Sequence, residues 1–508
     1  MLPQRLTTRR LFEVVLVLGL FAMAVRSIGD PDFWWHLRTG QQILATHSIP
    51  HFDFYSHTKY GAPWTAHEWL SEVIIYGVYR IAGYAGLIIT FAVCIACAFW
   101  MAFLRSAGKP YVAGVAVLWG AIATIPFWGI RPQIFSFLLT SVFLYLLDRF
   151  DETGKATVLW WMPLLMVLWV NLHGGFAIGL ALILLALVCK VAEAAWNPVA
   201  RSGSLRTARS LAVVVFACLV SVVVNPNGFR MYAYPFETLA SPSIQGYIQE
   251  WASPNFHQPR MQPFALLLIA SFAVLAASDR RPRTRAFLLL IASAWAGLQS
   301  SRHIPLFALA AIPMLAAGAE SWLNSRNLLA LFRGNESKRP HSALNYGIAL
   351  ILVLFCVLRV YVVAKNQPSF EAQELPVAAV QYIRQQHPPG PIFNSYEWGG
   401  YLIWTLYPEY RVYVDGRSDM YGDQFLTDFV GTYKAENDWR SILGRFGVRT
   451  AVLPLGSPLA VALETEPKWH VAFRDSLSVV LVQEASGRAK PAEASAPAIG
   501  QIGYSTPK

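Results

Sequence analysis

The sequence predicts a polytopic α-helical membrane protein with about 11 transmembrane helices and a C-terminal α/β domain outside the membrane. Of the 508 residues, 55% are hydrophobic and only 14% are charged, whereas soluble domains carry about 25% charged residues. Apolar runs long enough to span a bilayer, about 17 to 25 residues, recur along most of the chain. From Lys365 onward these runs stop, and short β-rich segments alternate with helical ones.

Eleven apolar segments are the predicted spans. They lie near residues 11–28, 85–104, 111–128, 133–148, 157–170, 176–196, 211–224, 262–278, 286–300, 304–320 and 346–363. Together they predict a transmembrane domain over residues 1–363, interrupted by long loops at 29–84 and 225–261. The five cysteines all lie in apolar runs and give neither a disulfide framework nor a metal-binding pattern.

The basic residues predict the orientation of these spans. With a cytoplasmic N-terminus, 18 Lys and Arg residues fall in the inner segments and seven in the outer loops that precede the C-terminal domain. The positive-inside rule therefore predicts an N-in, C-out protein of the cytoplasmic (inner) membrane. The net charge of +11 follows from this topology and does not indicate nucleic-acid binding.

The first span has two interpretations. Arg9 and Arg10, an apolar core and Ala22-Met23-Ala24 also fit a cleavable signal peptide. We favour a retained first helix, and the loop that follows is outside the membrane in either case.

The first outer loop carries the densest set of reactive side chains. Asp30 and Asp32 flank Pro31 directly after the first span. Five further candidates for substrate binding follow them: Trp34, Trp35, His36, His67 and Glu68. A carboxylate here could act as a general base, although Asp32 also fits the N-cap of a helix over Phe33–Ala45. The tryptophans could hold a sugar ring or a polyprenyl chain, or could anchor the loop at the lipid headgroups.

The segment from His67 to Arg80 has an apolar stripe with polar and aromatic edges. It fits an amphipathic helix at the outer membrane interface. The same pattern also fits the start of a long second transmembrane helix.

Polar side chains also mark the outer ends of later spans. Arg131, His173, Arg302 and His303 lie at these turns. The second outer loop adds Tyr232, Tyr234, Glu237, Glu250, Trp251 and His257. Each arginine could snorkel to the headgroups, and His173 could cap a tight turn. One shared polar cavity, however, explains all four residues, and so predicts that they converge.

The C-terminal domain is predicted over residues 364–484. Strands are expected at Pro391–Asn394, Arg411–Val414, Thr450–Leu453, His470–Phe473 and Val479–Val482, and helices at Val377–Gln386 and Gln424–Tyr433. Its most site-like segment is Asp415–Asp419, which also fits a plain polar turn. Residues 485–508, rich in Ala, Pro, Ser and Gly, are predicted to be disordered.

The sequence does not decide whether the protein has a metal site, and it does not identify the ligands. His51, Asp53 and His57, or His67 with Glu68, supply plausible ligands, but their spacing matches no compact zinc signature. A divalent cation such as Mg or Mn could instead be held by Asp30 or Asp32 together with a phosphate.

Several motifs resemble those of bacterial members of the GT-C superfamily of membrane glycosyltransferases. They are Asp-Pro-Asp-Phe-Trp-Trp-His-Leu-Arg-Thr-Gly, Trp64–Leu70, Arg131-Pro-Gln, Asn171–Gly175 and Asn225-Pro-Asn-Gly. The architecture is also similar: a first helix, an acidic outer loop, many spans and an outer α/β domain. The resemblance implies that the catalytic acid is Asp30 or Asp32, although Pro31 separates the adjacent acidic pair that is frequent in the superfamily.

The resemblance implies transfer of a sugar from a polyprenyl-phosphate donor on the extracytoplasmic side of the membrane. An aspartate would deprotonate the acceptor, which could be a glycan, a lipid or a protein, and the reaction would invert the anomeric carbon. Arg131 or Arg302, with His173 or His303, would stabilise the departing phosphate. The alternative is a transporter or flippase for a lipid-linked or polar substrate, although we find no clear internal repeat.

Overall fold

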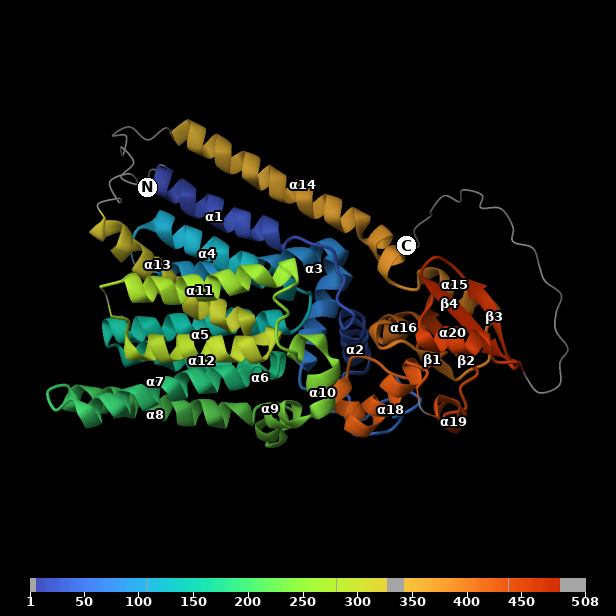
Figure 1. Ribbon diagram of the computed structural model, residues 1–508. Helices are drawn as coiled ribbons and strands as arrows, with labels where there is room; N and C mark the ends of the chain where they lie inside the picture. Colours follow the sequence, from blue (N-terminus) through green and yellow to red (C-terminus); the bar gives the residue numbers. More distant parts are fainter. Residues whose placement is uncertain (1–5, 107, 280, 327–341, 437, 485–508) are drawn as a thin grey trace.

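The computed structural model describes residues 6–106, 108–279, 281–326, 342–436 and 438–484. Long helices lie side by side in a bundle, and a small α/β domain sits at one end of it (Figure 1). The N-terminal end of α1 lies at the opposite end of the bundle from this domain. The tail at 485–508, which the sequence predicts to be disordered, lies outside the described residues.

Each predicted span corresponds to one helix of the bundle. These are α1 (Thr8–Ala24), α3 (Trp69–Arg105), α4 (Pro110–Thr124, continued by η1, Ile125–Phe127), α5 (Gln133–Thr153), α6 (Trp161–Leu172, preceded by η2, Ala156–Trp160), α7 (Phe176–Trp196), α8 (Arg201–Val222), α11 (Gln262–Ala277), α12 (Thr284–Gln299), α13 (Ile304–Ser325) and α14 (Ser342–Glu374). Among the described residues, eight helices are long and apolar enough to cross a membrane. The helices α1 and α12 and the η2–α6 segment are shorter and pack among them.

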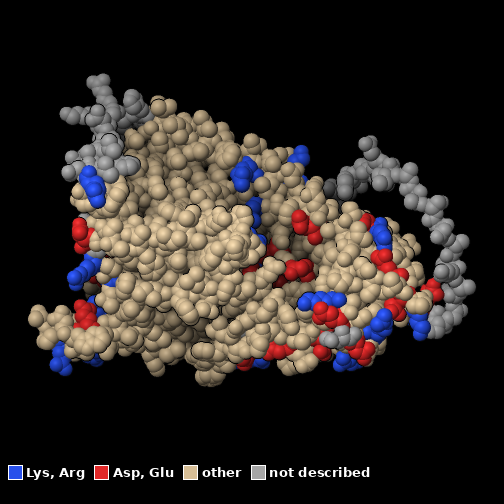
Figure 2. Space-filling model, viewed as in Figure 1, with Lys and Arg blue, Asp and Glu red and all other residues tan. Residues whose placement is uncertain are grey.

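The outer surface of the bundle is apolar. On the face drawn in Figure 2, a broad area of the bundle carries no charged side chains, and Lys, Arg, Asp and Glu gather at its end and toward the C-terminal domain. Only 11% of the most apolar part of α14 is buried, and its exposed face carries Leu350, Ile351, Leu354 and Leu358. Such a face is stable in lipid and not in water, which agrees with a multi-pass membrane protein.

The first outer loop folds into two helical pieces. The predicted helix after Asp32 is α2 (Phe33–Thr46). The predicted amphipathic segment forms the start of α3, where Gly83 adopts φ +57° and ψ −150° and bends the helix sharply. Because L side chains avoid this conformation, glycine permits the bend. Residues 69–82 therefore form a separate helical arm at the mouth of the bundle, joined without a loop to the span that follows.

The second outer loop is also largely helical. It contains α9 (Arg230–Ala240), α10 (Pro242–Tyr247) and the short turns η3 (Gln249–Trp251) and η4 (Pro259–Met261). Its contacts hold it against both parts of the molecule. The Ser241 hydroxyl donates to the Asp423 carboxylate at 2.5 Å, and the Ser300 hydroxyl donates to the backbone carbonyl of Glu250 at 3.1 Å.

The C-terminal domain contains a four-stranded mixed sheet in the order β1-β2-β4-β3. The strands are β1 (Ile392–Asn394), β2 (Thr450–Pro454), β3 (Trp469–Arg474) and β4 (Ser478–Gln483), and the helical elements are α15 (Val377–Gln386), η7 (Tyr396–Trp398), α16 (Gly399–Leu406), α17 (Ser418–Tyr421), α18 (Asp423–Tyr433), α19 (Trp439–Arg445) and α20 (Pro458–Glu464). Four of the five predicted strands and both predicted helices are confirmed.

The prediction of a strand at Arg411–Val414 is wrong. Residue Val412 instead makes a single parallel bridge with Ser56 of the first outer loop. The Val412 N–H donates to the Tyr55 carbonyl, and the His57 N–H donates to the Val412 carbonyl, each at 3.0 Å. The apolar alternation of this segment therefore reflects burial between the domain and the loop, and these bonds dock the two together.

Candidate active site

A cavity of about 840 Å³ lies where the bundle meets the C-terminal domain. Its walls come from the loop before α2, the start of α3, the loop before α5, the α6–α7 turn, the second outer loop, the turn before α13 and residues 416–419 of the C-terminal domain. Red acidic side chains are visible around the hollow at this junction in Figure 2. Loops that are far apart in sequence therefore share one cavity, as predicted from the polar ends of the helices.

The turn at the start of α2 directs both aspartates into this cavity. One oxygen of Asp30, Oδ1, accepts the backbone N–H of Asp32 at 3.0 Å, which is the bond of an Asx-turn. Asp32 stands at the N-cap position of α2 but caps no backbone N–H. Its Oδ1 accepts the indole N–H of Trp35 at 3.1 Å. The capping interpretation of Asp32 is therefore wrong, and its second oxygen, Oδ2, faces Arg131 in the cavity.

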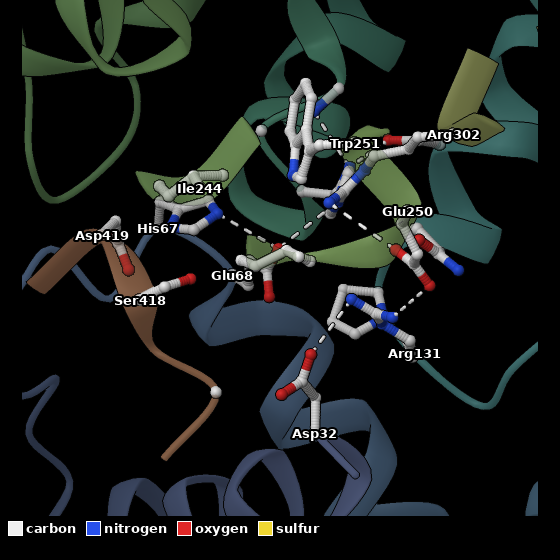
Figure 3. A pocket seen from close by; sticks show the side chains of 18 of the residues that line it. Asp32, His67, Glu68, Arg131, Ile244, Glu250, Trp251, Arg302, Ser418 and Asp419 are labelled. Carbon is white, nitrogen blue, oxygen red and sulfur yellow. Dashed lines mark hydrogen bonds and ion pairs between the residues drawn. The ribbon is translucent and has the colours of Figure 1, made fainter. Parts of the chain in front are cut away.

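Arg131, just before α5, joins three carboxylates. Its Nη1 lies 3.3 Å from Asp30 Oδ2 and 2.9 Å from Glu250 Oε1, and its Nη2 lies 3.0 Å from Asp32 Oδ2. Figure 3 shows Asp32, Arg131 and Glu250 turned toward one another. The side chain of Arg131 is 15% exposed, and its guanidinium is held by carboxylates and does not reach out to the lipid headgroups. The snorkelling interpretation of Arg131 is wrong.

The two aspartates are less acidic than exposed carboxyl groups. Burial raises the pKa of Asp30 to about 7; the charge of Arg131 lowers it, and the charges of Asp32 and Glu250 raise it further. Burial also raises the pKa of Asp32, against the lowering by Arg131 and by the Trp35 hydrogen bond. A carboxyl group that titrates near neutral pH can both take up and release a proton under working conditions.

A second cluster surrounds Glu68 on another side of the cavity. Its Oε1 lies 3.1 Å from His67 Nε2 and 3.5 Å from His173 Nε2, and its Oε2 lies 3.6 Å from His36 Nε2. Burial would raise the pKa of Glu68, but the three imidazoles lower it below its ordinary value. Glu68 is therefore an ionised carboxylate at neutral pH.

The hydrogen bonds of the histidines assign their protonation states. The Nδ1 atom of His173 accepts the Gly175 N–H at 2.9 Å, so its proton is on Nε2, which faces Glu68. Burial lowers the pKa of His173 to about 3, which keeps the ring neutral. For His67, burial opposes the charged form, but Glu68 raises the pKa above its ordinary value. The Nδ1 of His67 faces the Thr65 carbonyl at 3.2 Å, which fits a doubly protonated ring.

Arg302 is the cavity arginine with the fewest acidic contacts. Among the described residues, its one ion pair is with Glu250, where Nη1 lies 3.9 Å from Oε2. Its guanidinium stacks over the ring of Trp251 at 5.1 Å, which fixes it in place. The neighbouring His303 also lines the cavity, and its buried Nδ1 has no hydrogen-bond partner. Arg302 is thus the group best placed to take up an anion.

The segment Asp415–Asp419 of the C-terminal domain supplies the remaining wall. A Cβ on Gly416 would lie only 1.7 Å from Asp32 Oδ1, so the backbone of this domain directly abuts the candidate base. Ser418 and Asp419 also face the cavity (Figure 3). This segment is therefore part of the cavity wall, and the alternative interpretation as a polar turn without a role in the site does not describe it fully.

Arg417 in this segment fastens the domain to the first outer loop. Its Nε and Nη2 donate to the two oxygens of Asp415 at 2.7 Å each, and its Nη1 lies 2.8 Å from Asp53 Oδ1. The guanidinium lies over the ring of Trp64 at 4.6 Å, and the side chains of Arg417, Asp415 and Asp53 are fully buried. Asp53, a candidate metal ligand in the sequence, is therefore an ion-pair partner.

Ten of the eleven predicted site residues line the cavity. They are Asp30, Asp32, Trp35, His36, His67, Glu68, Arg131, His173, Arg302 and His303. Trp34 is the exception, because it is 2% exposed and packs against Phe33 and Tyr401. We therefore withdraw it as a binding residue. Trp35 lines the wall, and its ring lies against that of His36, with the centroids 3.6 Å apart and the ring planes tilted by 36°.

Several cavity residues were missing from the predicted site. They are Glu72, Tyr234, Glu250, Trp251, Tyr396, Glu397, Arg417 and Asp419. The sequence does contain an indication that Glu250 and Trp251 belong to the site, because an acidic and an aromatic residue are adjacent there in a long outer loop. For Glu72 there is no such indication, since it lies within an apolar segment.

The side chains that the structure describes do not by themselves form a cation site. Among the described residues, no group of three or more His, Cys, Asp and Glu side chains is arranged to hold a metal ion. The oxygens of Asp30 and Asp32 that point into the cavity face the Arg131 guanidinium. The arrangement fits an arginine-neutralised carboxylate pair and does not fit a Mg or Mn site.

The fold resembles those of two solved membrane proteins. The archaeal oligosaccharyltransferase AglB of Archaeoglobus fulgidus, tethered to an acceptor peptide, superimposes with a TM-score of 0.58 at 13% identity, over 88% of this chain and 69% of that one. The same enzyme in complex with an inhibitory peptide and a dolichol-phosphate gives a TM-score of 0.55 at 13% identity, over 87% of this chain and 69% of that one.

ArnT of Cupriavidus metallidurans in the apo state gives a TM-score of 0.52 at 16% identity, over 94% of this chain and 97% of that one. The sequence matches no protein-family profile and no curated protein. The similarity is therefore one of three-dimensional fold and not of sequence. Both AglB and ArnT are GT-C membrane glycosyltransferases.

Proposed function

We propose that this chain, which has the GT-C fold, is a membrane glycosyltransferase that moves a sugar from a polyprenyl-phosphate donor to an acceptor. The observation that carries the proposal is one cavity that holds Asp30 and Asp32, both of raised pKa, together with Arg131 and Arg302. Such a cavity can accept a proton at one place and stabilise an anion at another, as displacement of a phosphate by a hydroxyl requires.

The chemical step follows from this arrangement. An acceptor hydroxyl gives its proton to the carboxylate of Asp30 or Asp32 as its oxygen bonds to the anomeric carbon. The bond from that carbon to the donor phosphate breaks, and its electron pair leaves on the phosphate oxygen. Attack opposite the leaving group inverts the anomeric carbon. Of the two aspartates, Asp30 has a pKa of about 7, which suits a general base near neutral pH.

Arg302 is the proposed partner of the phosphate. Its stacking on Trp251 orients the guanidinium, and its weak contact with Glu250, at 3.9 Å, leaves it available. Binding of a dolichol-phosphate by AglB, which has the same fold, supports a lipid phosphate as the carrier. His173, with its proton on Nε2, and His303 are the neighbouring groups that we assign to the donor.

We place the site on the extracytoplasmic face of the cytoplasmic membrane. The basic residues of the loops at the opposite end of the bundle support this orientation. Because nucleotide sugars are made in the cytoplasm, a flipped lipid carrier is the simplest donor outside. The acceptor is a glycan, a lipid or a protein reached from the aqueous side.

The pH dependence of transfer tests the base. Since the pKa of Asp30 is raised to about 7 and the base must be ionised, the single-turnover rate should increase with pH and level off above about 7. The measurement is a quenched transfer assay with saturating donor between about pH 5 and pH 9. A flat profile, or the same midpoint in the residual activity of Asp30→Asn, would contradict the assignment.

Gly416→Ala tests the contact between the C-terminal domain and the base. The added methyl group would overlap Asp32 Oδ1, since the Cβ position is 1.7 Å away. The carboxylate must then move away from Trp35 and Arg131. We expect a loss of transfer of roughly 100-fold, as for other small misplacements of reacting groups. Gly444→Ala is the matched control, because a Cβ there meets nothing within 4 Å, and its activity should equal that of the wild type.

A further inference from the structure

Glu250 stands between Arg131 and Arg302, two of the arginines that line the cavity. Its Oε1 accepts a hydrogen bond from Arg131 Nη1 at 2.9 Å, and its Oε2 lies 3.9 Å from Arg302 Nη1. Burial would raise the pKa of Glu250, but the two guanidinium groups lower it below its ordinary value. An ionised carboxylate thus bridges the cationic groups to which an anionic ligand would bind.

The side chain of Glu250 is the most exposed of the three carboxylates that contact Arg131. It is 31% exposed, against 11% for Asp30 and 19% for Asp32. Its backbone, in contrast, is fixed. The Ser300 hydroxyl donates to the Glu250 carbonyl, and the Ser301 N–H and hydroxyl both donate to the carbonyl of Ala252, two residues later, at 3.0 Å. Rotation about the side-chain bonds therefore moves the carboxylate without moving the loop.

The two arginines keep their positions when Glu250 leaves. Arg131 retains Asp30 and Asp32 as partners, and Arg302 retains the face of Trp251. Two pre-positioned guanidinium groups favour binding of a phosphate, because charge-assisted hydrogen bonds from guanidinium N–H groups to its oxygens are strong. The phosphate and the Glu250 carboxylate cannot both occupy this position, since they carry charge of the same sign.

We propose that Glu250 is an internal placeholder for the phosphate of the lipid carrier. Before the donor binds, the Glu250 carboxylate pairs with Arg131 and Arg302. The incoming phosphate displaces it, and after transfer the carboxylate competes with the product phosphate for the same two guanidinium groups. The inference rests on the proposed function and adds a mechanism for product release to it. The donor is a phosphodiester with one negative charge, whereas the product is a monoester with about 1.5 to 2 charges near neutral pH. A competing carboxylate therefore counteracts the tighter retention of the product.

Binding of a lipid phosphate without any sugar tests this inference. The probe is farnesyl phosphate, titrated by calorimetry into the full-length protein in detergent micelles. We expect Glu250→Gln to bind it roughly tenfold more tightly than the wild type, because a site that is blocked about 90% of the time gains that factor when the block is removed. Glu250→Asp, which keeps the charge, should stay near the wild-type affinity.

Two controls locate the effect. Glu237→Gln removes a carboxylate from the same outer loop at a position that does not line the main cavity, and it should leave the affinity unchanged. Adding Arg302→Gln to Glu250→Gln should abolish the gain, since the gain depends on the freed arginine. A damaged fold would weaken binding, so a merely structural role of Glu250 cannot produce the expected increase.

The outcomes separate the inference from the proposed function. Equal or weaker binding by Glu250→Gln, with normal binding by the wild type, would overturn the placeholder role and leave the donor class standing. No binding by the wild type or by any variant would overturn the lipid-phosphate site and the placeholder together.

Discussion

Replacing Asp30 and Asp32 together by asparagine is expected to lower the rate of sugar transfer by roughly 100-fold to 10,000-fold, the usual contribution of a positioned general base. Asparagine keeps the size of the side chain and the capacity to accept the Asp32 and Trp35 N–H groups. It cannot take up the proton of the acceptor. The measurement is the single-turnover rate with purified protein and a lipid-linked donor at saturating concentration.

The single variants identify the base. Asp30→Asn should lose more activity than Asp32→Asn, because the pKa of Asp30 is raised to about 7. Asp428→Asn, on α18 and outside the cavity wall, is the matched control and should transfer at the wild-type rate. If the double variant folds normally, as judged by its thermal unfolding, and keeps more than about half of the activity, neither aspartate is the base.

Arg417→Met should loosen the C-terminal domain from the first outer loop. The guanidinium neutralises Asp415 and Asp53, and all three side chains are fully buried. Removing it leaves two carboxylates buried without a counter-charge, at a cost of roughly 3 to 5 kcal/mol. We expect a clear decrease in the melting temperature in detergent and faster proteolysis of the loop around residues 53–60. Transfer should also decrease, because Gly416 and Ser418 line the cavity.

The control for Arg417 is a surface arginine of the same domain. Arg440 pairs with Glu466 at 2.5 Å but is 64% exposed, and such pairs contribute only about 0 to 1 kcal/mol. Arg440→Met should therefore melt close to the wild type. A melting temperature for Arg417→Met equal to that of the wild type would show that backbone contacts alone, such as those of Val412, hold the domain in place.

The membrane helices were predictable because apolar runs of sufficient length have few alternatives. All eleven expected spans are helices of the bundle, but some of their ends were not foreseen. The helix α8 begins at Arg201 and not near residue 211, and α14 continues to Glu374 beyond residue 363. Both extensions are rich in polar residues. The apolar run therefore stops at the membrane boundary, whereas the backbone hydrogen bonds of the helix continue beyond it.

The convergence of Asp30, Arg131 and Arg302 was also predictable, because all three lie at the same end of the bundle. The direction of neighbouring side chains was not. Trp34 and Trp35 are adjacent on α2, where each residue turns by about 100°, so one is buried against Tyr401 and the other lines the cavity. The sequence alone did not fix which face of α2 would meet the C-terminal domain.

The contacts between the two domains could not be predicted from the sequence. Asp53 looked like a metal ligand beside His51 and His57, yet its partner is Arg417, more than 350 residues away. Glu250 likewise acquires its position from Arg131 and from Ser300. Pairings of this kind depend on how a loop docks, and no local periodicity records them.

The measurement that tests the central claim most directly is the fate of a labelled polyprenyl-phosphate sugar in proteoliposomes that contain the purified protein and an acceptor-bearing envelope extract. We predict that the wild type releases polyprenyl phosphate and moves the label to the acceptor, whereas the Asp30→Asn/Asp32→Asn variant does neither. Movement of the intact labelled lipid between leaflets, without cleavage and at the same rate in both proteins, would contradict the account and favour a transporter.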